Sequence, residues 1–378
     1  MNQLTIAHFK DHFLPLSETF IYNLLTGFDR HQHIVIDRYL QQNQARFPFQ
    51  PHYSPAEAIG TRYATLERIL LRFFGRSPYL ERVLKQEQVD LIHAHFGQLG
   101  ALIAPVARRH KRPLVVSFYA QSFSMFTDKA DWRWRFDRLW QDATLCLALG
   151  PVSVKELIAA GCPESKIAVV PLPIDTATFT YVERCFSPAE GLQLLTVGRL
   201  VPKKGLDVLL AALARLPHDA KWRLRIIGDG PQRSSLEALA AELDLQERIT
   251  FAGWLDSAAV AREMQKAQLF VLPSRTDPQT GETEGAPTVL LEAQATGLPV
   301  LSTHHADIAA NVTDGQGGWL VPEGDVEALA DRLEQIVMQP EQLEAQSRAA
   351  RDRIVRGHSK EAVAGYVQQL YEQCVTPS

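Results

Sequence analysis

Val197-Gly198-Arg199-Leu200-Val201-Pro202-Lys203-Lys204-Gly205 stands directly after an expected strand, 192–197, and before an expected helix that starts near Leu206. A strand, a glycine-bearing loop and a helix N-terminus form the repeating unit of parallel α/β sheets. Glycine lets the backbone approach a ligand, the free helix amides point at it, and Arg199 and Lys204 can neutralise its charge. The stretch therefore favours a diphosphate ligand, with exposed basic residues at a plain helix start as the alternative.

The same alternation of short β-rich runs and helix-length segments extends over almost all of the 378 residues, which is typical of parallel α/β sheets. Strands are expected at 4–9, 33–39, 89–96, 113–119, 144–149, 167–170, 192–197, 224–228, 249–251, 269–272, 300–302 and 319–321. Three prolines between 171 and 188 interrupt the pattern and predict a domain boundary. We expect two α/β domains of similar size, with ligands bound beyond the carboxyl ends of their strands.

The composition excludes several classes of protein. Hydrophobic residues make up 46% of the chain and charged residues 22%, which argues against wholesale disorder, a collagen-like chain or a coiled-coil rod. The four cysteines are far apart and form no C-x-x-C pair, so neither a zinc knuckle nor a disulfide framework is indicated. No run approaches the ~18 apolar residues that span a bilayer, and we expect a cytoplasmic protein that is at most peripheral to the membrane.

Charge is divided unevenly along the chain. Residues 1–187 carry 21 Lys and Arg against 17 Asp and Glu, whereas residues 188–378 carry 18 against 26. The positive balance of the first part favours an anionic partner, with a chance imbalance on a solvated surface as the alternative. The overall net charge of -4 and the lack of a recognition module exclude nucleic acid as a partner.

A second constellation spaces two acids across a helix start. Glu284 precedes Gly285-Ala286-Pro287-Thr288, and Glu292 follows it by eight residues, close to two turns of helix. Glu284 is then expected just before the helix N-terminus and Glu292 about two turns inside. One acid can contact a sugar at the helix start, and the other a ribose beside it.

With these motifs in place, the chain resembles the retaining glycosyltransferases of family four, whose C-terminal domain carries an E-x7-E motif matched by Glu284 and Glu292. The resemblance covers nearly the whole chain and includes 227–231 (IGDGP), 161–163 (GCP) and 317–325 (GGWLVPEGD) in the family's order. It implies a GT-B fold.

In that fold, two Rossmann-like parallel-sheet domains face a cleft. The resemblance implies an acceptor-binding N-terminal domain at 1–180, a nucleotide-sugar-binding C-terminal domain at 181–357, and a last helix, 358–374, that crosses back to the first domain. The donor is a UDP- or GDP-sugar, and no cofactor is expected.

The resemblance also assigns roles on the donor side. Arg199 and Lys204 bind the diphosphate and stabilise it as it leaves, in place of a divalent metal, and no Asp-x-Asp metal signature occurs in the sequence. Glu284 contacts the transferred sugar and Glu292 the ribose. The expected catalytic residues are therefore Glu284, Arg199 and Lys204, and the expected donor-binding residues are Gly198, Arg199, Lys204, Glu284, Thr288, Val289 and Glu292.

On the acceptor side, 13–20 (FLPLSETF) is similar to the P-x-x-S-E-T-F stretch of bacterial exopolysaccharide and colanic-acid transferases. Ser17, Glu18 and Thr19 then face the acceptor or the donor phosphates, unless Ser17 or Thr19 is a plain helix cap. Contacts to acceptor or sugar are also expected from His95 and from Tyr119.

Two departures from the family pattern affect the expected sugar contacts. Tyr119 stands where many family members have a histidine, and Ala310 stands where they have an acid. His93 and His95 share one strand face, but no third ligand lies nearby in sequence, so no metal site is expected.

The segment 62–85 is amphipathic and basic. It predicts contact with an anionic inner-membrane surface that would present a lipid-linked saccharide acceptor. The alternative is a domain helix with its apolar face in the core.

The function expected overall is metal-independent, retaining hexosyl transfer in exopolysaccharide or other cell-surface polysaccharide synthesis. A nucleotide-sugar epimerase of the same architecture and a non-catalytic nucleotide-sugar-binding subunit are the alternatives.

Overall fold

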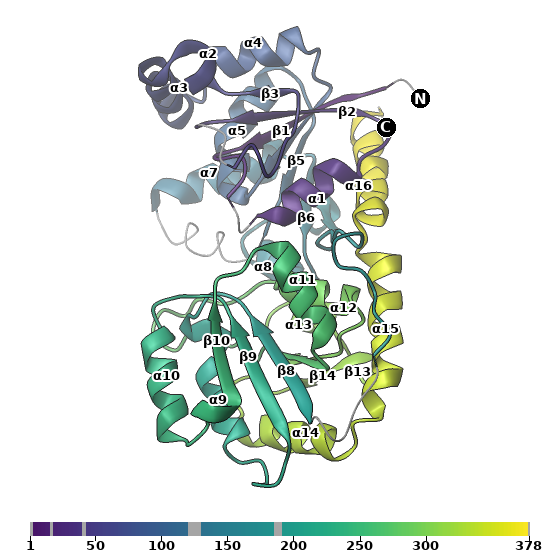
Figure 1. The fold of residues 1–378 in the computed structure, drawn as a ribbon. Coiled ribbons are helices and arrows are strands. Elements are labelled where there is room, and N and C mark those ends of the chain that lie inside the picture. Colours follow the sequence, from purple (N-terminus) through teal and green to yellow (C-terminus); the bar gives the residue numbers. More distant parts are fainter. Residues whose placement is uncertain (1–2, 16–17, 40–42, 120–129, 185–190, 377–378) are drawn as a thin grey trace. The chain divides into compact units, whose positions relative to one another are not determined.

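The computed structural model describes residues 3–15, 18–39, 43–119, 130–184 and 191–376. The chain divides into two compact units, shown in Figure 1: unit 1 is Met1–Pro173 together with Lys360–Ser378, and unit 2 is Ile174–Ser359. The division falls a few residues from the boundaries expected at 180 and 358.

Unit 1 contains a seven-stranded parallel sheet in the order β3-β2-β1-β4-β5-β6-β7. Its strands are β1 (Thr5–Lys10), β2 (Gln32–Asp37), β3 (His52–Tyr53), β4 (Leu91–His95), β5 (Leu114–Ser117), β6 (Leu145–Ala148) and β7 (Ile167–Val169). The strand order reverses between β1 and β4, and ligands of doubly wound sheets bind at the carboxyl ends of the strands beside such a reversal.

Helices cover both faces of this sheet, as the alternation in the sequence predicts. They are α1 (Thr19–Gly27), α2 (Pro55–Ile59), α3 (Thr61–Phe74), α4 (Pro78–Gln86), α5 (Gly97–Arg109), α7 (Ala130–Asp142), α8 (Pro151–Ala159) and α16 (Lys360–Val375). On one face, Leu24 of α1 and Val363 of α16 pack against Ile6 and Leu91 of the sheet. Helices α5 and α7 pack on the other face.

Unit 2 repeats this plan with a second seven-stranded parallel sheet, in the order β10-β9-β8-β11-β12-β14-β13. Its strands are β8 (Leu192–Val197), β9 (Trp222–Ile227), β10 (Ile249–Gly253), β11 (Leu269–Val271), β12 (Val300–Thr303), β13 (Thr313–Asp314) and β14 (Gly317–Val321). Its helices are α9 (Leu206–Leu213), α10 (Arg233–Glu242), α11 (Ser257–Lys266), α12 (Thr288–Ala295), α13 (Ile308–Asn311), α14 (Val326–Met338) and α15 (Gln342–Gly357). The order reverses between β8 and β11, so the quoted loop after β8 lies at the ligand-binding edge.

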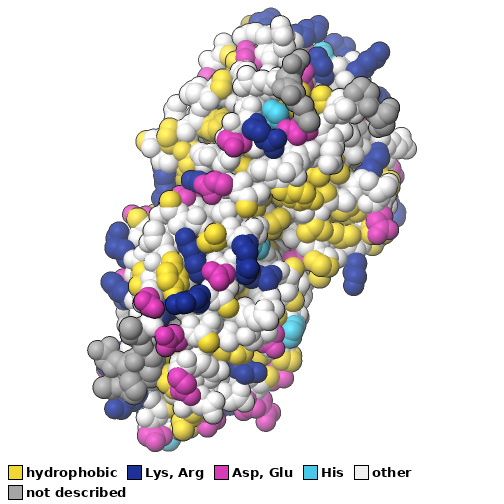
Figure 2. Space-filling model, turned by 90° about the vertical axis from the view of Figure 1, so that its right-hand side faces the viewer, with side chains coloured by type: hydrophobic (Ala, Val, Ile, Leu, Met, Phe, Trp, Pro, Cys, Tyr) yellow, Lys and Arg dark blue, Asp and Glu magenta, His cyan; other side chains and the backbone are white. Residues whose placement is uncertain are grey.

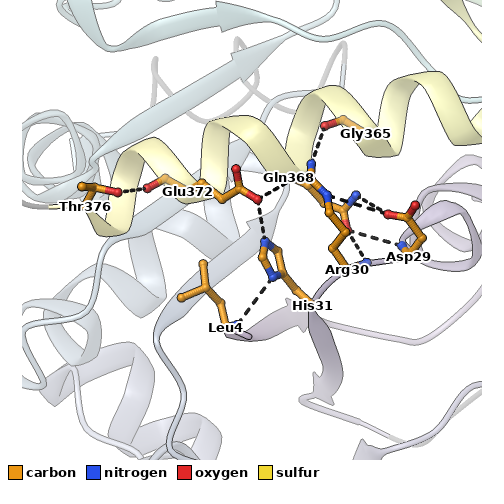
Figure 3. A network of polar contacts seen from close by, with 8 residues as sticks. All are labelled: Leu4, Asp29, Arg30, His31, Gly365, Gln368, Glu372 and Thr376. Atoms are coloured by element: carbon orange, nitrogen blue, oxygen red, sulfur yellow. Dashed lines mark hydrogen bonds and ion pairs between the residues drawn. The ribbon is translucent and has the colours of Figure 1, made fainter. Parts of the chain in front are cut away.

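The last helix, α16, returns to unit 1, which confirms the crossing-back expected for the C-terminal segment. Figure 3 shows the polar contacts that bind it there. The buried Gln368 accepts hydrogen bonds from the amides of Asp29 (3.3 Å) and Arg30 (3.0 Å) and donates to the Asp29 carboxylate (2.9 Å). Glu372 pairs with the Arg30 guanidinium at 2.8 Å. Helix α16 is thus part of the unit 1 core.

Candidate active site

The loop 198–205, after β8, is held in place by its neighbours. Leu200 is buried; its amide donates to the carbonyl of Asp229 and its carbonyl accepts from the amide of Gln232, both at 3.0 Å. Gly205 has a φ of 64°, and a Cβ there would lie 2.0 Å from the carbonyl oxygen of Pro273. Because no larger residue fits this backbone, the loop has a defined conformation against the segment that follows β11.

Arg275, just beyond β11, fastens the same loop from the other side. Its amide donates to the Lys203 carbonyl (2.9 Å), its Nε to the Pro202 carbonyl (3.2 Å), and its Nη2 pairs with the Asp207 carboxylate (2.8 Å). Arg275 is not among the sequence-predicted site residues. The available signal was its place a few residues after the expected strand 269–272, where ligand-binding residues are expected.

Lys204 and Glu284 form an ion pair, with 2.7 Å between Nζ and Oε2. Their side chains are 12% and 9% exposed, so the pair lies largely out of solvent. A Cβ on Gly198 would lie 3.3 Å from Cε of Lys204, which puts the lysine stem directly over the glycine. The structure thus brings Glu284 to Gly198 and Lys204 of the loop, which lie about 80 residues earlier in the sequence.

Two further residues position Glu284. Its backbone amide donates to Nε2 of His305 at 3.0 Å, so this nitrogen carries no proton and Nδ1 is the protonated one. Nδ1 of His305 in turn hydrogen-bonds the Glu323 carboxylate. The sequence analysis missed both residues, although Glu323 lies inside the quoted 317–325 motif.

Helix α12 presents Thr288 and Val289 as its first two residues, where backbone amides have no partner inside the helix. Glu292 follows in the second turn. Its carboxylate makes no hydrogen bond or ion pair within the described parts of the chain, and burial raises its pKa to about 7. The site therefore offers two amides and an unpaired carboxyl group from one helix.

Arg199 differs from the other donor-side residues. It is exposed, and its guanidinium makes no hydrogen bond or ion pair with the residues that the structure describes. Arg199 lies in the same loop as Lys204, but no contact joins it to the Lys204–Glu284 pair.

In unit 1, Lys10 at the end of β1 forms an ion pair with Glu18 and lies 4.3 Å from the ring centre of Phe96. Burial lowers the pKa of Lys10 and raises that of Glu18, while their mutual attraction opposes both shifts. Glu18 is the N-cap residue of α1 but makes no side-chain cap hydrogen bond. Thr19 begins the helix, and Ser17 lies outside the described residues.

His95 is fully buried, and its Nδ1 lies 2.9 Å from the hydroxyl of Tyr119. Tyr119 follows the carboxyl end of β5 and is partly buried. The structure therefore places these two predicted contacts together, with His95 behind Tyr119.

A third histidine, His8 from β1, joins His93 and His95 from β4, and their ligand nitrogens all lie within 4.8 Å of one another. The expectation of no metal rested on the lack of a third ligand nearby in the sequence. Nearness in the sequence does not decide this, because the parallel register sets His8 of β1 beside His93. Nδ1 of His8 hydrogen-bonds Nε2 of His95 at 3.0 Å.

Comparison with known proteins shows the family. Residues 17–178 match the model described as Glycosyltransferase Family 4, and residues 183–353 match Glycosyl transferases group 1. The chain is 31% identical over 316 residues to the Salmonella typhimurium protein WcaL, whose name describes a colanic acid biosynthesis glycosyltransferase, over 82% of the chain and 76% of WcaL. The chain belongs to the group 1 glycosyltransferases. The family expected from the E-x7-E motif is thereby confirmed.

Other relatives agree. This group 1 glycosyltransferase is 33% identical over 246 residues to the amylovoran biosynthesis glycosyltransferase AmsK of Erwinia amylovora, over 64% of the chain and 60% of AmsK. Among solved structures, Anabaena Alr3699/HepE in complex with UDP superposes with a TM-score of 0.78 at 17% identity, over 98% of this chain and all of that one. The lipopolysaccharide outer core galactosyltransferase WaaB superposes with a TM-score of 0.76 at 19% identity, over the same shares. These likenesses confirm the GT-B fold.

Proposed function

We propose that this glycosyltransferase moves a sugar from a nucleoside diphosphate sugar to a saccharide acceptor during synthesis of a cell-surface polysaccharide, with retention of the anomeric configuration. The relatives named for colanic acid and amylovoran synthesis support the product class. Proteins named for UDP and for GDP-mannose are both among the relatives, so the donor is proposed as a UDP- or GDP-sugar. The observation that carries the proposal is the Lys204–Glu284 pair, 2.7 Å apart at the carboxyl end of β8.

In this proposal Lys204 and Arg199 bind the donor diphosphate, together with the amides of Thr288 and Val289. The diphosphate competes with Glu284 for Lys204, and the exposed Arg199 is available to pair with it. Two cations and a helix N-terminus supply the positive charge for which other transferases use a divalent metal. Transfer is therefore metal-independent.

The two acids have separate roles. Glu292 accepts hydrogen bonds from the ribose hydroxyls, because its carboxyl group is unpaired and comes from the helix that binds the phosphate. Glu284 contacts the transferred sugar. His305 holds Glu284 in place by accepting a hydrogen bond from the Glu284 backbone amide.

For the chemical step we favour attack on the face from which the diphosphate leaves. The bond between the anomeric carbon and the phosphate oxygen breaks, and its electron pair stays on the phosphate. The acceptor hydroxyl oxygen bonds to the same carbon, and its proton passes to the phosphate oxygen. Lys204 and Arg199 stabilise the charge that develops on that oxygen.

We place the acceptor saccharide on unit 1. Glu18 and Thr19 lie at the start of α1, and Tyr119 lies past the end of β5, so these residues come from the strand ends where such sheets bind ligands. Ser17 belongs to the same proposed contact by its place in the sequence.

A lipid-linked acceptor is favoured by helix α3. Its large apolar side chains face outward, whereas the helix buries only Ala64 and Leu71 among its residues. The exposed set is Tyr63 (66%), Leu66 (50%), Ile69 (46%), Phe73 (65%) and Phe74 (68%). The segment expected as one amphipathic unit is two helices, and the alternative, an apolar face in the core, describes the second: α4 buries Leu80, Val83 and Leu84.

Charge around α3 is also suited to a membrane. Arg62 and Arg72 are exposed, whereas the one acid of the helix, Glu67, is turned inward to accept hydrogen bonds from Ser77 and Tyr79. By contrast, Figure 2, which views the side of α15 and α16, shows cations and anions intermixed. Aromatic side chains flanked by arginine suit the interface of an anionic bilayer. No helix within the described ranges is long and apolar enough to cross a membrane.

Flotation with vesicles tests the membrane contact. The protein should rise with vesicles that contain phosphatidylglycerol, and Phe73→Ser/Phe74→Ser should weaken this association at least about tenfold, because each phenylalanine loses buried apolar area. Met338→Ser, which removes an equally exposed side chain of unit 2, is the matched control. A wild-type protein that ignores anionic vesicles would refute the membrane contact.

The transfer itself is tested by incubating the protein with UDP- and GDP-sugars and lipid-linked oligosaccharides from polysaccharide-producing cells. Mass spectrometry should show an acceptor heavier by one sugar and a released nucleoside diphosphate. Interconversion of the nucleotide sugar without acceptor would show an epimerase instead. Saturable donor binding with neither hydrolysis nor transfer would indicate a non-catalytic subunit.

A further inference from the structure

A row of polar side chains crosses the buried face of the unit 1 sheet, beneath α1 and α16. It comprises His33 of β2, His8 of β1, His93 and His95 of β4, Ser117 of β5, and Tyr119 just beyond β5. Parallel register puts them on one face: His8 stands beside His93, and His95 beside Ser117. Buried polar groups are costly unless every one is satisfied, so their hydrogen bonds have to be consistent along the whole row.

The first hydrogen-bonded chain runs through three histidines to the tyrosine. Its links are 2.9 Å from Nδ1 of His33 to Nε2 of His8, 3.0 Å from Nδ1 of His8 to Nε2 of His95, and 2.9 Å from Nδ1 of His95 to the Tyr119 hydroxyl. Burial lowers the pKa of all three histidines, that of His33 to about 3. Each imidazole is therefore neutral and carries one N–H, and the donors in the chain must all point the same way.

The free end of this chain decides its direction. Nε2 of His33 is buried and has no hydrogen-bond partner among the described residues. If the chain ran from Tyr119 inward, this nitrogen would carry an orphaned buried N–H, which proteins rarely contain. In the opposite direction it is a lone pair, and His33, His8 and His95 each donate from Nδ1. The chain therefore donates to the oxygen of Tyr119.

A second chain starts on the last helix. Tyr371 of α16 is fully buried, and the one described partner of its hydroxyl is Nδ1 of His93 at 2.6 Å. Its proton must go there, so His93 carries its own proton on Nε2 and donates it to the Ser117 hydroxyl at 2.7 Å. Burial raises the pKa of the Tyr119 hydroxyl, so this group keeps its proton.

We propose that the first of these chains is a positioning device that makes the Tyr119 hydroxyl a fixed hydrogen-bond donor to a sugar oxygen of the saccharide substrate. Because the Tyr119 oxygen accepts from Nδ1 of His95, its own O–H is left to donate outward. Tyr119 and Ser117 line a small cavity with Phe20, Leu149 and Pro171, an apolar surround in which one directed donor selects for an acceptor oxygen. The assignment of the ligand rests on the proposed transferase function.

The directions of the chains can be measured without substrate. In protein labelled with ¹⁵N at histidine, nitrogen shifts should show N–H at Nδ1 for His8, His33 and His95, and at Nε2 for His93. Peaks are assigned from single variants. The Nδ1–H tautomer at His33, three hydrogen bonds of the chain away from Tyr119, is the decisive signal. An Nε2–H at His33, or a histidinium there, would overturn the proposal.

The metal alternative has its own outcome in that experiment. A metal held by His8, His93 and His95 would need one unprotonated ring nitrogen from each of them, and these nitrogens would no longer take part in the two chains. Loss of the N–H signals on addition of stoichiometric Zn²⁺, with tight binding, would replace the chains by a metal site and overturn the proposal.

Steady-state kinetics of variants then tests whether Tyr119 contacts the saccharide substrate. Tyr119→Phe should raise KM for the saccharide or lower kcat by roughly 3- to 10-fold, the worth of one hydrogen bond, while stabilisation of the protein by UDP is unchanged. His95→Leu should show the same kinetic loss as Tyr119→Phe. His95→Asn, which retains an N–H donor near the place of Nδ1, should recover part of that loss. Equal activity of Tyr119→Phe and wild type would refute the substrate contact. A wild type that binds neither UDP nor GDP would instead refute the transferase proposal.

Discussion

The two units place different chemistry at the same point of the same topology. In both, the strand order reverses beside a central strand, between β1 and β4 in unit 1 and between β8 and β11 in unit 2. Both have a partly exposed ion pair there, Lys204 with Glu284 in unit 2 and Lys10 with Glu18 in unit 1. Unit 1 has in addition a row of neutral, buried histidines.

The difference follows from burial. An ion pair within reach of solvent can exchange one partner for a charged ligand, and a diphosphate can replace the carboxylate on Lys204. A charge on the buried histidines would be desolvated at high cost, so those side chains stay neutral and can only orient a hydrogen bond. We infer that unit 2 binds charge and unit 1 positions a neutral saccharide.

The largest effect is expected from Lys204→Ala. Removing one preorganised group that stabilises charge in the transition state lowers kcat by about 10²- to 10³-fold, and steady-state kinetics measures it. Lys266→Ala, which removes a lysine that is 71% exposed and paired on α11, should leave kcat unchanged. A loss in both variants would mean that general charge, and not the Lys204 site, is responsible.

Glu284→Gln should have a smaller effect. If Glu284 only contacts the sugar, the variant loses one charged hydrogen bond, and kcat/KM falls about 10- to 100-fold. The residual transfer still gives the product with the retained anomeric configuration. Product NMR reads the anomer. A covalent glycosyl adduct on Glu284, trapped and located by mass spectrometry, would show that this residue is the nucleophile.

The pH dependence of donor binding should follow Glu292. With its pKa raised to about 7 by burial, the carboxyl group is protonated below that pH and ionised above it. If the ionised form accepts the ribose hydroxyls, donor affinity rises about tenfold from pH 6 to pH 8, and Glu292→Gln removes the rise. Calorimetric titration measures both. A wild-type affinity that is flat over this range would remove Glu292 from the ribose contact.

Without donor, the same group should act on stability in the opposite sense. Between its ordinary pKa of 4.5 and about 7 the folded protein holds more protons than the unfolded chain, so the free energy of unfolding falls as the pH rises through this window. In Glu292→Gln this fall should be absent, and denaturant titration at pH 5 and pH 8 would measure it.

The smallest effect is expected from Gly198→Ala. The added Cβ would lie 3.3 Å from Cε of Lys204, a close contact that the lysine relieves by changing rotamer at small cost. KM for the donor should rise about threefold, since the ammonium moves but remains present. An unchanged KM would show that the position of the lysine stem does not matter for binding.

The sequence predicted the strands better than the side-chain contacts between them. All twelve expected strands are present, because buried parallel strands are continuous apolar runs; β3 and β13 were missed, since two residues at a sheet edge leave no pattern. The resemblance assigned Lys204 and Glu284 to one donor site, but it did not predict their direct ion pair.

The residues that support the site could not be predicted in the same way. His8, His33 and Tyr371 meet His93 and His95 only through strand register and the return of α16. Likewise, His305 reaches the amide of Glu284 from another strand-to-helix loop. Such partners have no fixed spacing in the sequence.

The central claim, that Lys204 binds the diphosphate of a donor, is tested most directly by a thermal-shift titration of UDP and GDP against wild type and Lys204→Ala. At 100 times its Kd, the matching nucleotide should stabilise the wild type by about 2.7 kcal/mol. The variant should be stabilised far less at the same concentration. Equal stabilisation of both proteins, or none by either nucleotide, would contradict the account.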